Sequence, residues 1–132
     1  MLKGLGYKIG DTVRDDLQNV HLALCTRRGM PAIEIIYATE TPGPVSGILK
    51  ANASMIYHIC YTSKDLEKSL DAMERDNNRV VLISAPKPAP LFGGRKVSFH
   101  LVHGFGMIEI LEDDQPRSRS GGKKSHEKVV IS

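Results

Sequence analysis

The chain has 132 residues, 41% of them hydrophobic, which predicts a single domain large enough for a real core. Its apolar runs stay well short of the ~18–20 residues of a membrane-spanning helix, which argues against a membrane protein. The net charge of +3 arises at one end, because residues 116–132 hold five basic groups and one acid, whereas residues 1–115 hold 13 basic and 14 acidic groups. The body has no basic stripe interleaved with aromatics, so nucleic acid is not a favoured partner.

Residues 115–132 are expected to form a basic, disordered tail beside a domain at 1–114, because the tail combines Pro, Gly and Ser with like charges. The N-terminus, Met1–Gly6, lacks the apolar segment of a signal peptide. The two cysteines, Cys25 and Cys60, lie in apolar strand patterns, which favours buried free thiols over a disulfide. Free thiols suit a reducing cytoplasm, which is the expected compartment.

The first half of the chain contains two strand-like segments, Val20–Cys25 and Ala32–Tyr37. The short connection between them predicts a hairpin. A Pro/Gly loop begins at Thr41, and Val45–Lys50 is expected to form a short helix after it.

The second half begins with a strand at Met55–Thr62, followed by a helix that ends near Asp76. Apolar residues at i, i+4 and i+7 indicate that this helix is amphipathic, and Thr62 or Ser63 is its expected N-cap. Three further strands are predicted, the last two as a closing hairpin: Arg79–Ser84, Lys96–Val102 and Met107–Glu112. This order of strand, helix and three strands indicates an α+β fold with a mostly antiparallel sheet.

Three residues of the metal-ligand type stand in the middle of apolar strands: Glu34, His58 and Glu109. A bare carboxylate inside an apolar strand costs several kcal/mol unless it is paired or binds a cation. Carboxylate oxygen and imidazole nitrogen together suit a hard or borderline divalent metal. The alternatives are a solvent-facing glutamate and a hydrogen-bonded histidine of the ordinary kind, since the pattern does not show that the three faces converge.

Four segments of the second half together resemble the vicinal oxygen chelate superfamily, in its glyoxalase I and methylmalonyl-CoA epimerase branch (the glyoxalase/bleomycin resistance family). They are Tyr57–Tyr61, Asp65–Glu67, Pro86–Arg95 and Gly106–Glu112. The resemblance implies two βαβββ modules whose sheet cups a divalent ion, such as Zn, Ni, Co, Mn or Mg. It also implies that His58, Glu109 and Glu34 are metal ligands, and that Glu109 and Glu34 act as catalytic groups.

The chain departs from the family pattern in two ways. The chain begins near the end of the first module's helix, so the first module lacks its first strand and helix, and with them a histidine ligand. The epimerases carry a catalytic glutamate on the second strand of module one, which we assign to Val20–Leu22, where His21 is the candidate base or an ordinary strand residue. A missing strand would leave a sheet edge uncovered, which predicts a homodimer, formed for example by strand exchange.

The resemblance implies an isomerase or lyase that moves a proton α to a carbonyl, on an acyl-CoA thioester or a glutathione adduct. The alternative is a non-catalytic small-molecule-binding module with an incomplete metal site. Arg95, Lys96 and Phe92 are the expected substrate-binding residues, because they follow or precede the Gly93-Gly94 hinge of a candidate lid at 86–95. A solvated turn in a plain long loop is the alternative for this segment.

Overall fold

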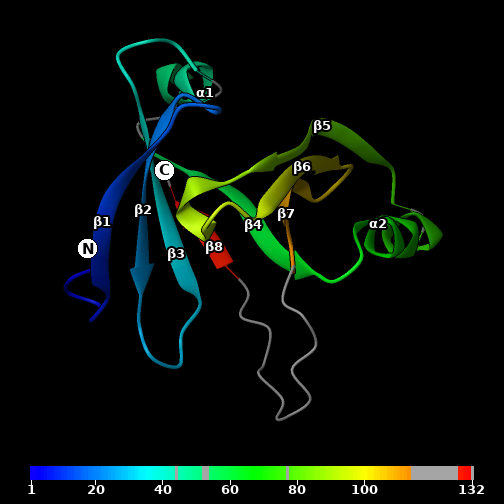
Figure 1. Cartoon of the computed structure of the whole chain (residues 1–132), viewed down its shortest axis with the longest axis horizontal. Helices are drawn as coiled ribbons and strands as arrows, with labels where there is room; N and C mark the ends of the chain where they lie inside the picture. The colour runs from blue at the N-terminus through cyan, green and yellow to red at the C-terminus, as the bar shows by residue number, and fades with distance from the viewer. Residues whose placement is uncertain (44, 52–53, 77, 114–127, 132) are drawn as a thin grey trace.

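The computed structural model describes residues 1–43, 45–51, 54–76 and 78–113, and the backbone of 128–131. The described chain forms one eight-stranded sheet with two α-helices and one 3-10 turn (Figure 1). The strands are β1 (Lys8–Asp15), β2 (Val20–Thr26), β3 (Ala32–Ala38), β4 (Ile56–Ser63), β5 (Val80–Pro88), β6 (Lys96–Val102), β7 (Gly106–Glu112) and β8 (Lys128–Ile131). The helical segments are α1 (Ser46–Ala51), α2 (Leu66–Arg75) and η1 (Pro90–Phe92).

The sheet has two halves of the same design. Its strand order is β1-β2-β3-β8-β4-β7-β6-β5. In each half three outer strands are antiparallel neighbours, and an inner strand runs parallel to the third: β8 beside β3, and β4 beside β7. The halves meet where β8 and β4 pair antiparallel. This is the predicted α+β fold with a mostly antiparallel sheet, and the two halves are the two modules.

The structure corrects the assignment within the first module. The first of its three outer strands is β1, which the sequence pattern did not predict. Val20–Leu22, which we assigned to that position from the sequence, belongs instead to the next strand, β2. Strand β1 is an edge strand with exposed polar residues and a register shift between Ile9 and Thr12, which hides the alternation expected of a strand. Only the pairing with β2 identifies it.

Strand β8 lies in the segment expected to be a tail. It fills the position between β3 and β4, so the structure differs there from the predicted domain limit at 114. Residues 114–127 of the predicted tail lie outside the described residues. The predicted strand exchange between two copies rested on an uncovered position in the sheet. In the structure, β8 of the same chain occupies that position.

Each face of the sheet carries two apolar clusters, one per half. On the face that bears the predicted ligands, the first cluster is Val20, Leu22, Ile36 and Val45, and the second is Cys60, Ala89, Val97, Phe99 and Leu111. Turn η1 closes this face, since Leu91 packs on the first cluster and Phe92 on the second. Residues 86–95, predicted as a long loop, thus consist of the end of β5 and this packed turn.

The opposite face is covered differently in the two halves. Helix α2 packs Leu66, Leu70 and Met73 on Val102, Ile108 and Ile110 of the second half. Its N-cap is Asp65, whose side chain accepts from the Lys68 amide, rather than Thr62 or Ser63.

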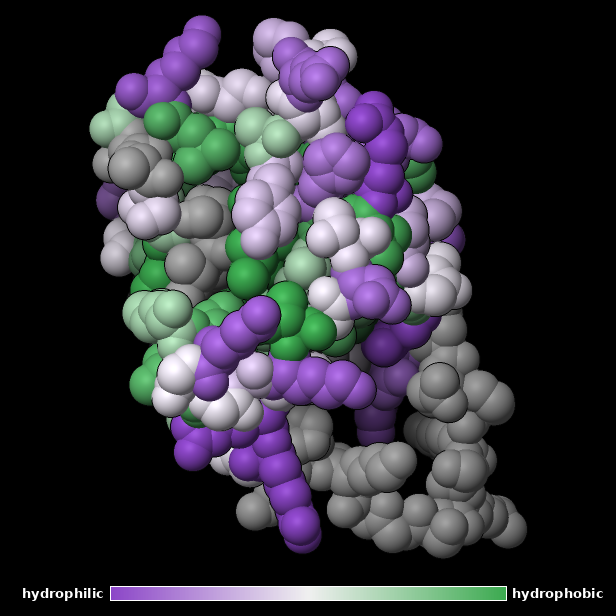
Figure 2. Space-filling model, turned by 90° about the vertical axis from the view of Figure 1, so that its left-hand side faces the viewer, coloured by the Kyte–Doolittle hydropathy of each residue, from purple (hydrophilic) through white to green (hydrophobic). Residues whose placement is uncertain are grey.

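The first half is covered on that face by the N-terminal turn, where Leu2 and Tyr7 pack on Cys25 and Ile33. Seen from the side of β1, apolar atoms gather over the middle of the surface and polar atoms toward its ends (Figure 2). Within the described residues, no helix is long and apolar enough to cross a membrane.

Candidate metal centre

The three predicted ligands meet at the centre of the sheet. Glu34 comes from β3, His58 from β4 and Glu109 from β7, and each residue is 3% exposed. His58 Nε2 lies 3.2 Å from Glu109 Oε2 and 3.9 Å from Glu34 Oε2. One ligand atom from each residue lies within 4.8 Å of the others. The structure therefore supplies the convergence that the sequence pattern leaves open.

Strand pairing explains why the faces converge. Cys60 pairs with Glu109 across β4 and β7, and His58 stands two residues before Cys60. Cys60, Glu109 and His58 therefore share one face of the sheet. Strand β8 separates β3 from β4, and Glu34 pairs with Val130 on β8. The glutamates thus approach His58 from opposite sides of β4.

The electrostatics of the cluster favour a cation. Two carboxylates are buried beside a single imidazole, and at most one positive charge on His58 opposes two negative charges. His58 Nδ1 is buried and has no hydrogen-bond partner among the described residues. Burial and the charge of Glu109 raise the pKa of the Tyr57 phenol, so this neighbour stays neutral. One nitrogen and two carboxylate oxygens fit a divalent metal ion, whose two positive charges balance the glutamates.

The three predicted ligands form the polar floor of a small cavity. Its walls are mostly apolar and come from both halves of the sheet and from the residue before α1: Val20, Ile36, Val45, Tyr57 and Phe99. The rings of Tyr57 and Phe99 pack edge-on against the imidazole of His58, with centroids at 5.1 and 5.2 Å. These contacts fix the orientation of the ring and keep water from most of its surface.

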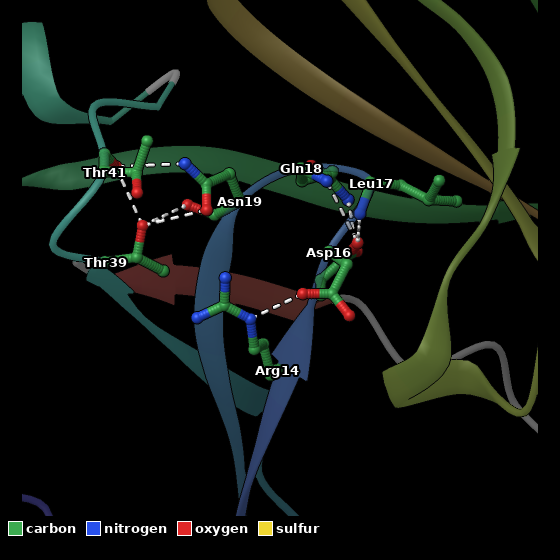
Figure 3. A network of polar contacts seen from close by, with 8 residues as sticks. Arg14, Asp16, Leu17, Gln18, Asn19, Thr39 and Thr41 are labelled. Carbon is green, nitrogen blue, oxygen red and sulfur yellow. Dashed lines mark hydrogen bonds and ion pairs between the residues drawn. The ribbon is translucent and has the colours of Figure 1, made fainter.

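Gln18 is the further polar residue of the cavity, and the sequence pattern did not single it out. The buried carboxylate of Asp15 holds the β1–β2 turn by accepting from the amides of Leu17 and Gln18, and Oδ2 accepts from Gln18 Nε2 at 3.1 Å. Figure 3 shows this turn beside the Thr39 and Asn19 side chains, which bond to each other at 3.0 Å. Recognising Gln18 required the position of β1, which the sequence did not reveal.

Tyr57 was missed for another reason. Strict alternation along a strand places Tyr57 and His58 on opposite faces. The pairing of β4 with β8 shifts register between Ile56 and Ile59, and both side chains line the cavity. A β-bulge re-aims side chains in this way and leaves no simple signal in the sequence.

The predicted substrate residues do not line this cavity. Arg95 Nε donates to the Glu112 carbonyl at 2.9 Å, and Nη2 lies 3.7 Å from Asp113 Oδ1. Lys96 is exposed, and Phe92 packs on the cluster around Cys60.

The histidines of β6 and its following turn are also separate from the centre. His100 is buried on the α2 side of the sheet beside Ser98, with Nε2 and Oγ 2.9 Å apart, and His103 is exposed. Burial lowers the pKa of His100.

Comparisons with known proteins agree with this architecture. A family model described as the Glyoxalase/Bleomycin resistance protein/Dioxygenase superfamily matches residues 1–99. A hypothetical protein from Bacillus halodurans C-125 is 18% identical with a TM-score of 0.67, covering 89% of this chain and 84% of that one. Methylmalonyl-CoA epimerase from Mycobacterium tuberculosis is 17% identical with a TM-score of 0.67, covering 86% and 75%.

A variant of the Streptomyces coelicolor methylmalonyl-CoA epimerase, in complex with 2-nitronate-propionyl-CoA, is 16% identical with a TM-score of 0.62. The match covers 83% of this chain and 81% of that one. No curated protein sequence matches the chain.

Proposed function

Because the chain belongs to the glyoxalase/bleomycin resistance protein/dioxygenase superfamily, we propose that it is a metal-dependent isomerase or lyase that moves a proton α to a carbonyl. The observation that carries the proposal is the buried cluster of Glu34, His58 and Glu109. Two carboxylates and an imidazole in an apolar cavity are the groups that bind a divalent ion and also transfer protons.

The three ligand residues have distinct tasks in this proposal. A divalent ion held by them would polarise a carbonyl oxygen of the substrate, which acidifies the neighbouring C–H bond. Glu34 and Glu109 lie on opposite sides of His58, on strands β3 and β7. One carboxylate accepts the α-proton while the C–H electron pair moves toward the carbonyl oxygen, and a carboxylate returns a proton to carbon. Return from the opposite side inverts the carbon, and return to the neighbouring carbon isomerises the substrate.

The proposed substrate is an acyl-CoA thioester or a glutathione thiohemiacetal. Structural relatives support the first class, since they include methylmalonyl-CoA epimerases solved with methylmalonyl-CoA or a propionyl-CoA derivative. Turn η1 lies on the face of the sheet that bears the cavity, and Arg95, Lys96 and Phe92 follow this turn or belong to it, so we retain them as candidates for the distal part of such a substrate. Homodimer formation and a reducing cytoplasmic location remain predictions, and the latter rests on the buried thiols of Cys25 and Cys60.

A non-catalytic binding module is the second candidate. The described cavity wall contributes neutral Gln18, and its carboxylates are Glu34 and Glu109, which would also hold the metal. A site whose bases are all engaged as ligands favours binding of a small molecule over its turnover.

Metal content tests the cluster directly. We expect near-stoichiometric divalent metal by plasma mass spectrometry in the untagged protein, and its loss in a His58→Ala/Glu109→Ala double variant. The matched control is His103→Ala/Glu74→Ala, which removes the same residue types from exposed positions and should retain the metal. Circular dichroism of both variants separates lost ligands from lost folding. Absence of metal from the wild type after incubation with excess Zn, Ni, Co, Mn or Mg would overturn the proposal.

Isotope exchange separates the two candidates. Methylmalonyl-CoA in deuterated water should acquire deuterium at the α-carbon when the metal-loaded enzyme is added, and Glu109→Gln should slow this exchange by about 10²–10⁴-fold. A parallel assay follows conversion of the methylglyoxal–glutathione thiohemiacetal. Tight binding of either compound without exchange or conversion would favour the binding module.

A further inference from the structure

A row of three apolar side chains borders the candidate metal centre in the second half of the sheet. Val81 on β5 pairs with Leu101 on β6, and Leu101 pairs with Met107 on β7. Leu101 stands two residues after Phe99, which lines the cavity, and Met107 stands two residues before Glu109, so the row lies on the cavity face. Met107 packs on the cluster around Phe99, whereas Val81 and Leu101 are 40% and 42% exposed. The apolar wall of the cavity therefore continues outward to the edge strand β5 (Figure 1).

The corresponding row in the first half is polar. Lys8 pairs with Thr26 across β1 and β2, and both residues are exposed. One residue beyond the Cys25–Ile33 pair, Thr26 lies opposite Ala32, which stands two residues before the buried glutamate of β3. The row of Lys8, Thr26 and Ala32 is thus as far from its glutamate as the apolar row is from the glutamate of β7.

The two rows lie at opposite ends of the cavity face. Strand β3 is parallel to β8 and β7 is parallel to β4, while β8 and β4 are antiparallel, so β3 and β7 begin at opposite ends of the sheet. The polar end is also basic, because residues 1–10 and 26–33 contain no acid and four basic residues: Lys3, Lys8, Arg27 and Arg28. The face therefore runs from an apolar end, past the candidate metal centre, to a basic end.

We infer that the acyl group of the substrate carries a hydrocarbon substituent larger than methyl, and that this substituent lies on the row of Val81, Leu101 and Met107. The inference rests on the proposed function. The side chains of the row offer no donor to the amide carbonyls of a CoA carrier, so hydrocarbon is the part of a thioester that fits them. The phosphates of the carrier fit the basic end, since arginine binds phosphate through charge-assisted hydrogen bonds. Binding of the substituent would bury the apolar surface that the free protein exposes.

A series of 2-alkylmalonyl-CoA thioesters tests the size of the substituent. Methylmalonyl-, ethylmalonyl- and butylmalonyl-CoA share the α-proton, the free carboxylate and the carrier, and differ in hydrocarbon alone. We expect kcat/KM for α-proton exchange to rise about twofold to fourfold with each methylene, the rate equivalent of burying a CH₂ group in part or in full. Butylmalonyl-CoA should therefore exceed methylmalonyl-CoA by about tenfold or more.

A pair of variants tests the place of the substituent. Leu101→Ser removes the middle of the row, so the ratio of butylmalonyl-CoA to methylmalonyl-CoA in kcat/KM should fall to about threefold or less. Leu82→Ser is the matched control, because Leu82 is 58% exposed on the same pair of strands but pairs with His100 on the opposite face. Its ratio should equal that of the wild type. Methyl NMR gives a readout independent of turnover, in which butylmalonyl-CoA should shift the signals of Leu101 and Val81 and leave those of Leu82 in place.

The outcomes separate this inference from the proposed function. Equal kcat/KM for the three thioesters, or an unchanged ratio in Leu101→Ser, overturns the apolar row and leaves the proposed function standing. Absence of exchange with all three overturns the proposed function. Shifts at Leu101 without exchange would then keep the row as part of a binding module, and no shifts would overturn it too. A dimer in light scattering that Leu101→Ser dissociates would assign the row to a contact between two copies, which also overturns the inference.

Discussion

The two halves of the sheet share one design but are assembled differently. The second half, β4 to β7, comes from one continuous segment, Ile56–Glu112. The first half joins β1 to β3 from the start of the chain with β8 from its end. Contacts between segments close in sequence form at low loop-closure cost, whereas the pairing of Ala32 on β3 with Lys128 on β8 joins residues 96 positions apart. The second half is thus the locally specified half.

The two halves also differ in what covers the face opposite the predicted ligands. An amphipathic helix, α2, covers Ile108 and Ile110 in the second half, each 1% exposed. In the first half the N-terminal turn covers Ile33, which is 8% exposed. The candidate metal centre thus lies between two halves of the sheet whose opposite faces are buried to different degrees. That face is more completely buried in the second half than in the first.

The largest expected effect concerns the two glutamates. Glu109→Gln should lower α-proton exchange by about 10²–10⁴-fold, the usual contribution of a general base. Glu34→Gln should have the smaller effect of the two, because Glu109 approaches His58 Nε2 to 3.2 Å and Glu34 to 3.9 Å. The measurement is the rate of deuterium incorporation at saturating metal, with Co²⁺ affinity recorded alongside. Equal losses would mean that the two halves contribute equivalently, which would contradict the expected asymmetry between Glu109 and Glu34.

Core packing should separate the halves by stability. Ile108→Ala should reduce the free energy of unfolding by about 2–5 kcal/mol, as expected for an enclosed isoleucine. Ile33→Ala should cost about 2 kcal/mol or less, since Leu2 and Ile9 beside it are partly exposed and can move into the space. Urea denaturation of each variant gives the comparison, and Leu82→Ala, at a position 58% exposed, is the control expected within about 0.5 kcal/mol of the wild type. A larger loss at Ile33 would reverse the ranking of the two halves.

The same division explains what could be predicted from the sequence. The strands and helix of the second half follow from apolar alternation and helical spacing over short distances, and so do the mid-strand positions of His58 and Glu109. The mid-strand carboxylate of Glu34 was equally visible, because β3 is a regular apolar strand. Convergence of the three residues was not predictable, since it depends on the order of strands across the sheet.

The missed features all depend on pairing between distant segments. Strand β1 has few buried residues and a register shift, so its identity comes from β2. Strand β8 lies in a charged segment typical of a tail, and only its register with β3 and β4 makes it part of the sheet. Gln18 and Tyr57 follow from these two strands, one through the β1–β2 turn and the other through the irregular β4–β8 pairing.

A glycine substitution tests the edge of the first half. A Cβ on Gly10 would lie 2.6 Å from the Leu24 carbonyl oxygen, so Gly10→Ala must displace backbone in the β1–β2 pair. We expect a loss of about 1–3 kcal/mol in the free energy of unfolding, the range found for overpacking. Gly47→Ala in α1 is the control of opposite sign, because nothing lies within 4 Å and alanine is the better helix former by about 0.5–1 kcal/mol. An unchanged stability in Gly10→Ala would mean that β1 adjusts freely at the edge.

The smallest effect is a pH dependence confined to the second half. Burial lowers the pKa of His100 below its ordinary value of 6.5, so between the folded and unfolded pKa values the unfolded chain binds more protons. Stability from this group is complete above the unfolded pKa and declines as the pH falls toward the folded one. The free energy of unfolding should therefore drop less between pH 8 and about pH 5 in His100→Gln than in the wild type. His103→Gln, at an exposed position, should follow the wild-type profile. Identical profiles for His100→Gln and the wild type would show that the charged imidazole of His100 does not destabilise the fold. Burial beneath α2 would then not exclude water from this side chain.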